Sequence, residues 1–209
     1  MLTIKVKKQL QETNLAVDLT VGAEIIAIVG PSGAGKTTIL NMIAGITEAD
    51  EGMIRYKDVN FVEDGKQVLP IQARKIGYVF QDYALFPHKT VEENIMYSVK
   101  DRLFIESLMG KLSIAHLRNK YPHEVSGGEQ QRVALLRAYA MQPNILLLDE
   151  PFSALDEETK EKSYAQLLSL HEATKTPIIL VTHNRGEVKR IAGRAYELKH
   201  GELHLLKRE

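Results

Sequence analysis

The 209-residue sequence has no cysteine, which excludes disulfides and zinc–thiolate sites and is typical of a protein in a reducing cytosol. It has no excess of either charge, because 27 Lys and Arg balance 27 Asp and Glu. No overall field therefore favours nucleic acid or an anionic membrane, and we expect no nucleic-acid partner. The longest apolar runs, 25–29 and 145–148, fall far short of the ~20 residues that span a bilayer. A membrane role would therefore depend on a partner chain.

Two kinds of strand pattern are present. Three segments alternate apolar and polar side chains or follow a turn signal, namely residues 2–7, 15–21 and 53–59. Such alternation is typical of an antiparallel sheet with one solvated face. Three runs are apolar throughout, namely residues 25–29, 145–148 and 178–181. These are typical of parallel strands covered on both faces, so the sequence predicts an α/β fold that combines both sheet types.

Helical spacing dominates residues 82–140, which we interpret as a helical insertion into the α/β core. Thr90 and Glu93 predict a capping box, followed by the apolar residues Ile95, Met96 and Val99. Three further helical stripes are expected to supply core residues, namely Leu103, Leu108, Leu112 and Leu117; Val133, Leu136 and Ala140; and Tyr164, Leu167, Leu168 and His171.

The segment 24–44, EIIAIVGPSGAGKTTILNMIA, joins an apolar run to a glycine-rich loop and then to helical spacing. This context predicts a phosphate-binding P-loop. The glycines let backbone N–H groups turn toward an anion, and the helix N-terminus and Lys36 add positive charge. Expected nucleotide contacts are Gly30, Pro31, Ser32, Gly33, Ala34, Gly35, Lys36, Thr37 and Thr38. The alternative is a glycine-rich turn without a ligand.

Two other apolar runs end in polar residues at the edge where parallel sheets bind ligands. Asp149 is expected to hold Mg²⁺ through water, and Glu150 to polarise a water for attack on a γ-phosphate. His183 is a candidate hydrogen-bond donor to a γ-phosphate oxygen. Taken alone, these residues also fit a simpler interpretation, with solvated acids and a structural histidine at strand ends.

Residues 125–132, VSGGEQQR, place Ser126, Gly127 and Gly128 before a strongly predicted helix at 130–141. This pattern indicates a second anion-binding helix N-terminus, although an ordinary N-cap with a glycine turn would look the same. One nucleotide does not need two glycine-lined phosphate sites on one chain. We therefore expect this site to serve a nucleotide on another subunit.

Together these motifs resemble those of the ATP-binding subunits of ABC transporters of the importer type. Walker A corresponds to 30–37, Walker B to 145–150 and the signature to 126–132. The resemblance implies that ATP and Mg²⁺ are bound and that ATP is hydrolysed. The resemblance implies that the catalytic residues are Glu150, His183, Gln81 and Lys36. It also implies that the metal ligands are Thr37, Gln81 and Asp149, and that Asp156 in the D-loop contacts the nucleotide.

The same resemblance implies an ABC ATPase fold over residues 1–209. A P-loop core with an antiparallel β-subdomain would comprise 1–81 and 141–209, and a helical subdomain with the signature would comprise 82–140. ATP would close a head-to-tail homodimer, with each nucleotide between Lys36 of one chain and Ser126 and Gly128 of the other. The dimer would act at the cytoplasmic face of the membrane on permease subunits and, indirectly, with a solute-binding receptor.

The cluster after the Q-loop, Tyr83, Leu85, Phe86 and Pro87, is a candidate permease contact, and its alternative is local packing against the helix that begins after Thr90. The segment YVFQDYALFPH and the short helical insertion are most like subunits that import small solutes, including molybdate or other oxyanions. The alternatives are a non-transport ABC ATPase and a nucleotide-binding interaction module without hydrolysis.

Two positions depart from the family pattern. The family usually stacks adenine on an aromatic residue in the first strand region, but no aromatic precedes Tyr56 here, and Lys7, Lys8 and Leu10 occupy that region. Loss of a base stack costs about 1–3 kcal/mol, which predicts weaker ATP affinity or poorer adenine selectivity. Glu129 replaces the commoner Gln in the signature, and we expect this change to be tolerated.

Overall fold

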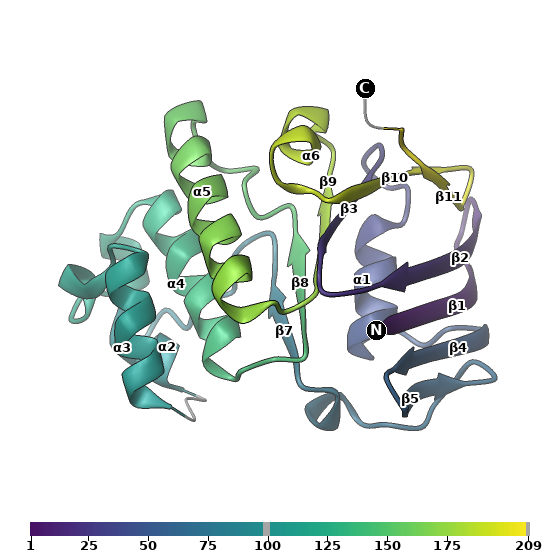
Figure 1. The fold of residues 1–209 in the computed structure, drawn as a ribbon, viewed down its shortest axis with the longest axis horizontal. Helices are drawn as coiled ribbons and strands as arrows, with labels where there is room; N and C mark the ends of the chain where they lie inside the picture. Colours follow the sequence, from purple (N-terminus) through teal and green to yellow (C-terminus); the bar gives the residue numbers. More distant parts are fainter. Residues whose placement is uncertain (98–100, 208–209) are drawn as a thin grey trace.

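The computed structural model describes residues 1–97 and 101–207, which form a curved mixed sheet with helices on both faces (Figure 1). The strands are β1 Leu2–Gln9, β2 Asn14–Val21, β3 Ile25–Val29, β4 Glu51–Tyr56, β5 Val59–Glu63, β6 Lys66–Gln67, β7 Ile76–Val79, β8 Ile145–Asp149, β9 Ile178–Thr182, β10 Arg194–Lys199 and β11 Glu202–Leu205. The helices are α1 Lys36–Ala44, α2 Val91–Met96, α3 Arg102–Lys111, α4 Gly127–Ala140, α5 Glu157–Thr174 and α6 Arg185–Ile191. Short 3-10 turns are η1 Ile71–Arg74, η2 Ala115–Leu117 and η3 Pro122–Glu124. The strand order is β6-β5-β4-β1-β2-β11-β10-β3-β9-β8-β7.

One half of the sheet is antiparallel. β1 pairs with β2 and β4, so that Ile4 lies opposite Leu19 and Ile54. These three side chains are buried, whereas Lys5 and Asp18 on the outer face are exposed and form an ion pair. The prediction of two half-buried strands in this part of the chain is confirmed.

The third candidate strand, residues 53–59, is wrong as a single strand. β4 ends at Tyr56, Lys57 adopts a left-handed φ of 52°, and the chain reverses into β5 at Val59. The two strands pair antiparallel. Asp58 is a turn-forming residue type, so the apolar positions on its two sides belong to two strands of a hairpin.

The other half of the sheet is parallel, and every residue of β3, β8 and β9 is buried. Neighbouring side chains of β3 face opposite cores. Ile26 and Ile28 pack with α1 and the antiparallel strands, while Ile25, Ala27 and Val29 pack with α2 to α6. The predicted combination of both sheet types in one α/β fold is confirmed.

The helices divide between these two cores. α1 lies between the parallel strands and the antiparallel half, whereas α2 to α5 lie together on the opposite side (Figure 1). Because β3, β8 and β9 are parallel neighbours, their carboxyl ends reach the same edge of the sheet. This edge is where α/β folds place ligand sites.

The predicted capping box at the start of α2 is confirmed. The Glu93 backbone N–H donates to the Thr90 hydroxyl at 3.2 Å, and the Thr90 N–H donates to the Glu93 carboxylate at 2.7 Å. Ile95 is buried and Met96 packs against the same core. Val99 lies outside the described residues.

The prediction of burial is wrong for two residues. Leu103 is 83% exposed, because α3 is capped by Asp101 and its buried stripe begins at Ile105 instead. Leu168 is 39% exposed, and α5 buries Leu170 in its place. The other expected apolar positions of these stripes are buried, namely Leu108, Leu112, Leu117, Val133, Leu136, Ala140, Tyr164 and Leu167. His171 is half-buried, and α4 begins at Gly127, three residues earlier than expected.

None of the helices in the described ranges 1–97 and 101–207 is long and apolar enough to cross a membrane.

Candidate functional site

The glycine-rich loop joins the end of β3 to the start of α1. Gly33 and Gly35 adopt left-handed φ values of 79° and 99°, which favour glycine, and Gly35 is the N-cap of α1. A Cβ atom on Gly35 would approach methyl groups of Leu10 and Leu15 at 3.0 Å. Packing against the β1–β2 hairpin therefore adds a second reason for glycine at this position.

Lys36 lies at the first position of α1, with a side chain that is only 5% exposed. Its ammonium donates to the carbonyl oxygens of Gly30 and Pro31, each at 2.9 Å. The same nitrogen lies 3.7 Å from Glu150 Oε1. A buried cation is therefore held at the base of the loop, beside the acid at the end of β8.

Thr37 and Asp149 meet across the gap between α1 and β8. The Thr37 hydroxyl donates to Asp149 Oδ1 at 3.1 Å. Burial raises the pKa of Asp149, and the hydrogen bond from Thr37 partly offsets that effect. The Thr37 hydroxyl and the buried Asp149 carboxylate are oxygen ligands that suit Mg²⁺. This ion uses few protein ligands and completes its octahedron with phosphate oxygens and water. Within the described ranges there is no cluster of three His, Asp or Glu that would make a separate metal cage.

Tyr78 is a site residue that the sequence reasoning missed. Its hydroxyl donates to Asn41 Oδ1 at 3.1 Å, which joins β7 to α1. Burial, followed by the negative charge of Asp149, raises the pKa of Tyr78. The available signal was its place in the short apolar run that leads to Gln81.

Glu150 and His183 are brought together at the ends of β8 and β9. His183 Nδ1 lies 2.9 Å from Glu150 Oε2. Glu150 has a left-handed φ of 44°, and its N–H donates to the Val181 carbonyl at 3.0 Å. Such a conformation costs a non-glycine residue about 1–3 kcal/mol and is concentrated at functional sites. In this conformation the carboxylate lies near both Lys36 and His183.

Gln81 leaves the sheet at the same edge. Val79 of β7 pairs with Leu148 of β8 in a parallel ladder, so the segments that follow these two strands leave the sheet side by side. The Gln81 side chain is exposed. Its role toward a metal or a water stays a prediction.

The signature segment lies elsewhere. Ser126 is the N-cap of α4, which packs in the core on the opposite face of the parallel strands from α1. A Cβ on Gly128 would lie 2.5 Å from the Thr159 methyl, and one on Gly127 would lie 3.9 Å from the Ala154 carbonyl oxygen. The signature thus borders the start of α5, and within one chain it is separated from the phosphate loop.

Two acids near the signature act as helix caps. Glu129 accepts from the Ser126 N–H at 2.8 Å in a capping box, which accounts for an acid at this position. Asp156 is the N-cap of α5 and accepts from the N–H and hydroxyl of Thr159 at 2.9 and 2.7 Å. The hydrogen bonds from Thr159 lower the pKa of Asp156. Its expected contact with nucleotide stays a prediction.

The cluster after Gln81 is partly buried. Tyr83 is 5% exposed, and its hydroxyl donates to the Pro151 carbonyl at 3.4 Å. Phe86 is half-buried between the Tyr97 ring, at a centroid distance of 5.1 Å, and the Arg137 guanidinium, at 5.3 Å. Tyr83 therefore packs locally and offers little surface for a permease contact. Pro87 is exposed.

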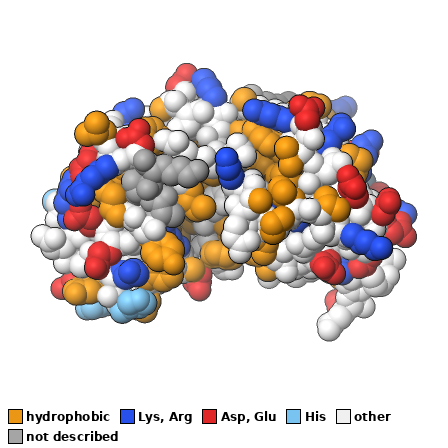
Figure 2. Space-filling view, turned by 90° about the horizontal axis from the view of Figure 1, so that it is seen from below, with side chains coloured by type: hydrophobic (Ala, Val, Ile, Leu, Met, Phe, Trp, Pro, Cys, Tyr) orange, Lys and Arg blue, Asp and Glu red, His pale blue; other side chains and the backbone are white. Residues whose placement is uncertain are grey.

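Hydrophobic side chains also form patches between charged groups on the lower face of the molecule, which Figure 2 shows. The exposed apolar residues include Tyr97, at 65% exposure, which contacts Phe86. Apolar surface therefore remains available beside the segment that follows Gln81.

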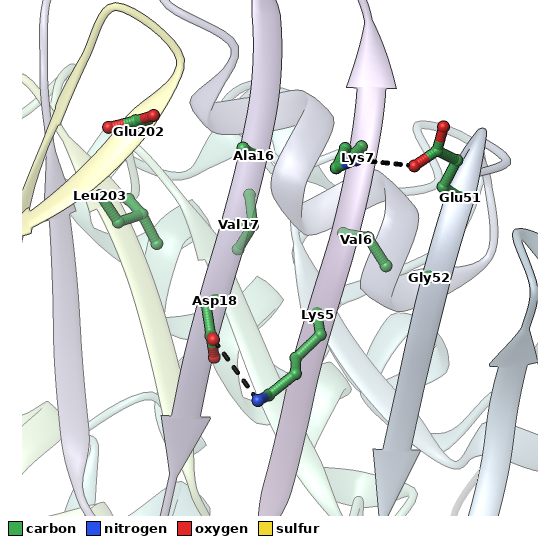
Figure 3. A pocket seen from close by; sticks show the side chains of 10 residues that line it. All are labelled: Lys5, Val6, Lys7, Ala16, Val17, Asp18, Glu51, Gly52, Glu202 and Leu203. Atoms are coloured by element: carbon green, nitrogen blue, oxygen red, sulfur yellow. Dashed lines mark hydrogen bonds and ion pairs between the residues drawn. The ribbon is translucent and has the colours of Figure 1, made fainter.

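Two cavities open on the sheet side of the molecule. One, of about 740 Å³, adjoins Pro31 to Ala34 and is also lined by the β1–β2 and β10–β11 turns, which include Leu10 and His200. The other, of about 420 Å³, lies on the outer face of β1, β2, β4 and β11, where Lys5 pairs with Asp18 and Lys7 with Glu51 (Figure 3). Only the first adjoins the phosphate loop.

The site can be compared with known proteins. Residues 13–153 match a family model described as ABC transporter. The molybdenum import ATP-binding protein ModC of Haemophilus influenzae is 43% identical over 208 residues, which cover 96% of this chain and 58% of that protein. The sulfate/thiosulfate import ATP-binding protein CysA of Xanthomonas campestris is 39% identical over 195 residues, which cover 88% of this chain and 55% of that protein. This chain thus spans less than two thirds of the length of either relative.

A solved structure extends the likeness to three dimensions. The ATP-binding cassette MJ0796, a dimer in a post-hydrolysis state bound to ADP and Pi, superposes with a TM-score of 0.82. It is 30% identical, and the match covers 100% of both chains. The predicted fold class is confirmed.

Proposed function

This chain belongs to the ABC transporter family, and on that basis we propose that it hydrolyses ATP to power the import of a small solute through separate membrane-spanning subunits. One observation carries the proposal. Lys36, Glu150 and His183 converge at the carboxyl edge of the parallel strands, with separations of 3.7 Å and 2.9 Å. A cation, a carboxylate and an imidazole beside a phosphate loop can bind the phosphates, polarise a water and donate a hydrogen bond, which are roles that phosphoryl transfer to water uses.

Each of these side chains has a separate role in the proposed hydrolysis. Lys36 binds the β- and γ-phosphates, because its ammonium lies at the base of the loop formed by Gly30 to Gly35. Glu150 orients and polarises the attacking water, and His183 donates to a γ-phosphate oxygen. Gln81, at the same edge, would respond to the γ-phosphate and its metal.

Thr37 and Asp149 would hold Mg²⁺. When bound, this ion neutralises charge that develops on the phosphate oxygens. The buried Asp149 would bind it through water, since its Oδ1 already accepts from the Thr37 hydroxyl. Gln81 would supply a third oxygen near the sheet edge.

A second copy would complete each nucleotide site. Ser126, Gly127 and Gly128 lie away from the phosphate loop of their own chain, and the similar cassette structure is a dimer. We propose that ATP lies between Lys36 of one chain and the α4 N-terminus of the other, with Asp156 nearby. Binding would then close the dimer and hydrolysis would reopen it.

The permease would be contacted near the segment after Gln81, where Phe86, Pro87 and Tyr97 offer apolar surface. Residues 82–140 would form the lobe that carries this contact and the signature. The chain would then be peripheral at the cytoplasmic face of the membrane. A molybdate-like oxyanion is the proposed solute, since the compared relatives are named for molybdenum and sulfate or thiosulfate import.

The direct test is phosphate release from MgATP by the purified chain, together with co-purification of a permease after tagging. Activity that requires Mg²⁺ and a bound permease with an oxyanion receptor are the expected results. A folded chain that binds ATP but never hydrolyses it, with or without a permease, would instead support a nucleotide-binding interaction module.

Base selectivity is expected to be poor. The cavity beside Pro31 to Ala34 is the proposed place for the base and ribose, and its lining among the described residues contains Leu10 and His200 but no Tyr or Phe. The absent stack corresponds to about 1–3 kcal/mol of binding energy. Titration calorimetry with the Glu150→Gln variant should therefore give similar Kd values for ATP and GTP. Tripolyphosphate serves as the control for the phosphate loop alone, and a strong preference for ATP would contradict the prediction.

A further inference from the structure

Glu187 is a buried carboxylate that the proposed mechanism does not use. It lies in the first turn of α6, and only 3% of the residue is exposed. Its Oε2 accepts from the Thr182 hydroxyl at 2.6 Å. Burial raises the pKa of Glu187, and the hydrogen bond from Thr182 lowers it. The charges of Lys160 and His183 also lower this pKa, whereas the charge of Glu150 raises it. Burying a carboxylate without partners costs free energy, so a buried acid at this position indicates a specific role.

The Thr182 hydroxyl connects this acid to the turn that presents His183. It donates to Glu187 and accepts from the Asn184 N–H at 3.0 Å. Asn184 in turn accepts from the Gly186 N–H at 2.8 Å and caps α6. The residues on both sides of His183 are therefore tied to the start of α6.

The His183 side chain has little packing to hold it, since it is 59% exposed. Its placement depends on the backbone turn and on its contact with Glu150 at 2.9 Å. Glu150 lies in turn 3.7 Å from Lys36. A continuous series of contacts therefore runs from Glu187 through Thr182 to the reacting edge of the sheet.

We propose that Glu187 is a positioning residue for His183. Its carboxylate fixes the turn at residues 182–184 through the Thr182 hydroxyl, so that the imidazole faces Glu150 and the bound phosphate. The inference rests on the proposed function, and it adds a residue that the sequence motifs do not mark. It requires a hydrogen-bond acceptor at position 187 rather than a particular charge.

Four substitutions separate this role from a structural one. Glu187→Leu and Thr182→Val remove the hydrogen bond, whereas Glu187→Gln and Thr182→Ser keep an acceptor and a hydroxyl. The first pair should lower kcat by at least about 10-fold, since small displacements of catalytic groups have effects of this size or larger. The second pair should retain activity, and in the first pair the Kd for ATP should change much less than kcat. Glu161→Gln is the matched control, because Glu161 pairs with Arg190 of α6 but has no contact with the turn.

A readout without hydrolysis completes the test. The imidazole ¹H–¹⁵N signals of His183, assigned by their loss in His183→Ala, should change in Glu187→Leu and stay unchanged in Glu187→Gln and Glu161→Gln. Unchanged signals in a folded Glu187→Leu protein, or a kcat that falls only with the folded fraction, would overturn the proposal. A wild-type chain without ATPase activity would refute the proposed function alone, since the imidazole signals still report whether Glu187 holds the turn.

Discussion

Replacing Glu150 by Gln is expected to lower ATP turnover by at least about 100-fold, the scale of a lost general base. The amide cannot take a proton from the attacking water. It keeps the size of the side chain and a hydrogen-bonding contact for His183, which lies 2.9 Å from the carboxylate. Phosphate release under saturating MgATP measures the change.

Nucleotide binding should survive the same substitution. The carboxylate lies 3.7 Å from the Lys36 ammonium, so its removal eliminates an anion that competes with the phosphates for this cation. The variant should therefore hold ATP without hydrolysing it and accumulate as the closed dimer, which analytical ultracentrifugation with and without ATP would detect.

Glu172→Gln is the matched control for this prediction. Glu172 lies near the end of α5, where it is exposed and pairs with Lys175. Its substitution should leave turnover and dimerisation unchanged. Wild-type ATPase activity in a folded Glu150→Gln protein would contradict the assigned mechanism, whatever the behaviour of the control.

The parts of the site that follow from strand topology could be predicted from sequence. Asp149, Glu150 and His183 each follow an apolar run, and parallel pairing of β3, β9 and β8 places these runs together. The phosphate loop is similarly local, because its glycines and Lys36 lie within a single strand–turn–helix segment. Sequence periodicity is sufficient where neighbours in space are fixed by short chain segments.

Buried polar residues could not be predicted in this way. Glu187 and Arg74 have no local pattern that marks them, since their partners come from separate elements. Leu103 was wrongly predicted to be a core residue, because the sequence does not show that α3 begins at Arg102 and that its buried stripe begins at Ile105. A shift of one residue in a helix start moves the stripe by about 100°, which tertiary contacts alone resolve.

Arg74 joins three elements on the antiparallel side of the fold. Its side chain is fully buried, and its Nη1 donates to the Met42 and Ile43 carbonyls at the end of α1, at 3.2 and 2.8 Å. Nη2 donates to the Phe61 carbonyl of β5 at 3.3 Å, and Nε to the Leu69 carbonyl at 3.2 Å. α1 carries Lys36 at its other end, so this guanidinium fixes the helix that positions the phosphate site.

Arg74→Met should therefore lower the free energy of unfolding by about 3 kcal/mol or more, because it leaves several buried carbonyls without their charged donor. Such a loss is a large share of the ~5–15 kcal/mol that stabilises a typical protein. Urea denaturation of the purified chain measures it.

Two further variants define the cause. Arg55→Met is the control, since Arg55 is exposed on β4, and its substitution should change stability by no more than about 0.5 kcal/mol. Gly45→Ala should reproduce much of the loss, because Gly45 caps α1 at a φ of 90° and a Cβ there would lie 2.7 Å from Arg74 Cζ. A loss below about 1 kcal/mol in Arg74→Met, the net value of a single ordinary hydrogen bond, would show that the carbonyls find other partners. A loss near the expected size would show that the Arg74 contacts stabilise the end of α1, the helix that carries Lys36 at its other end.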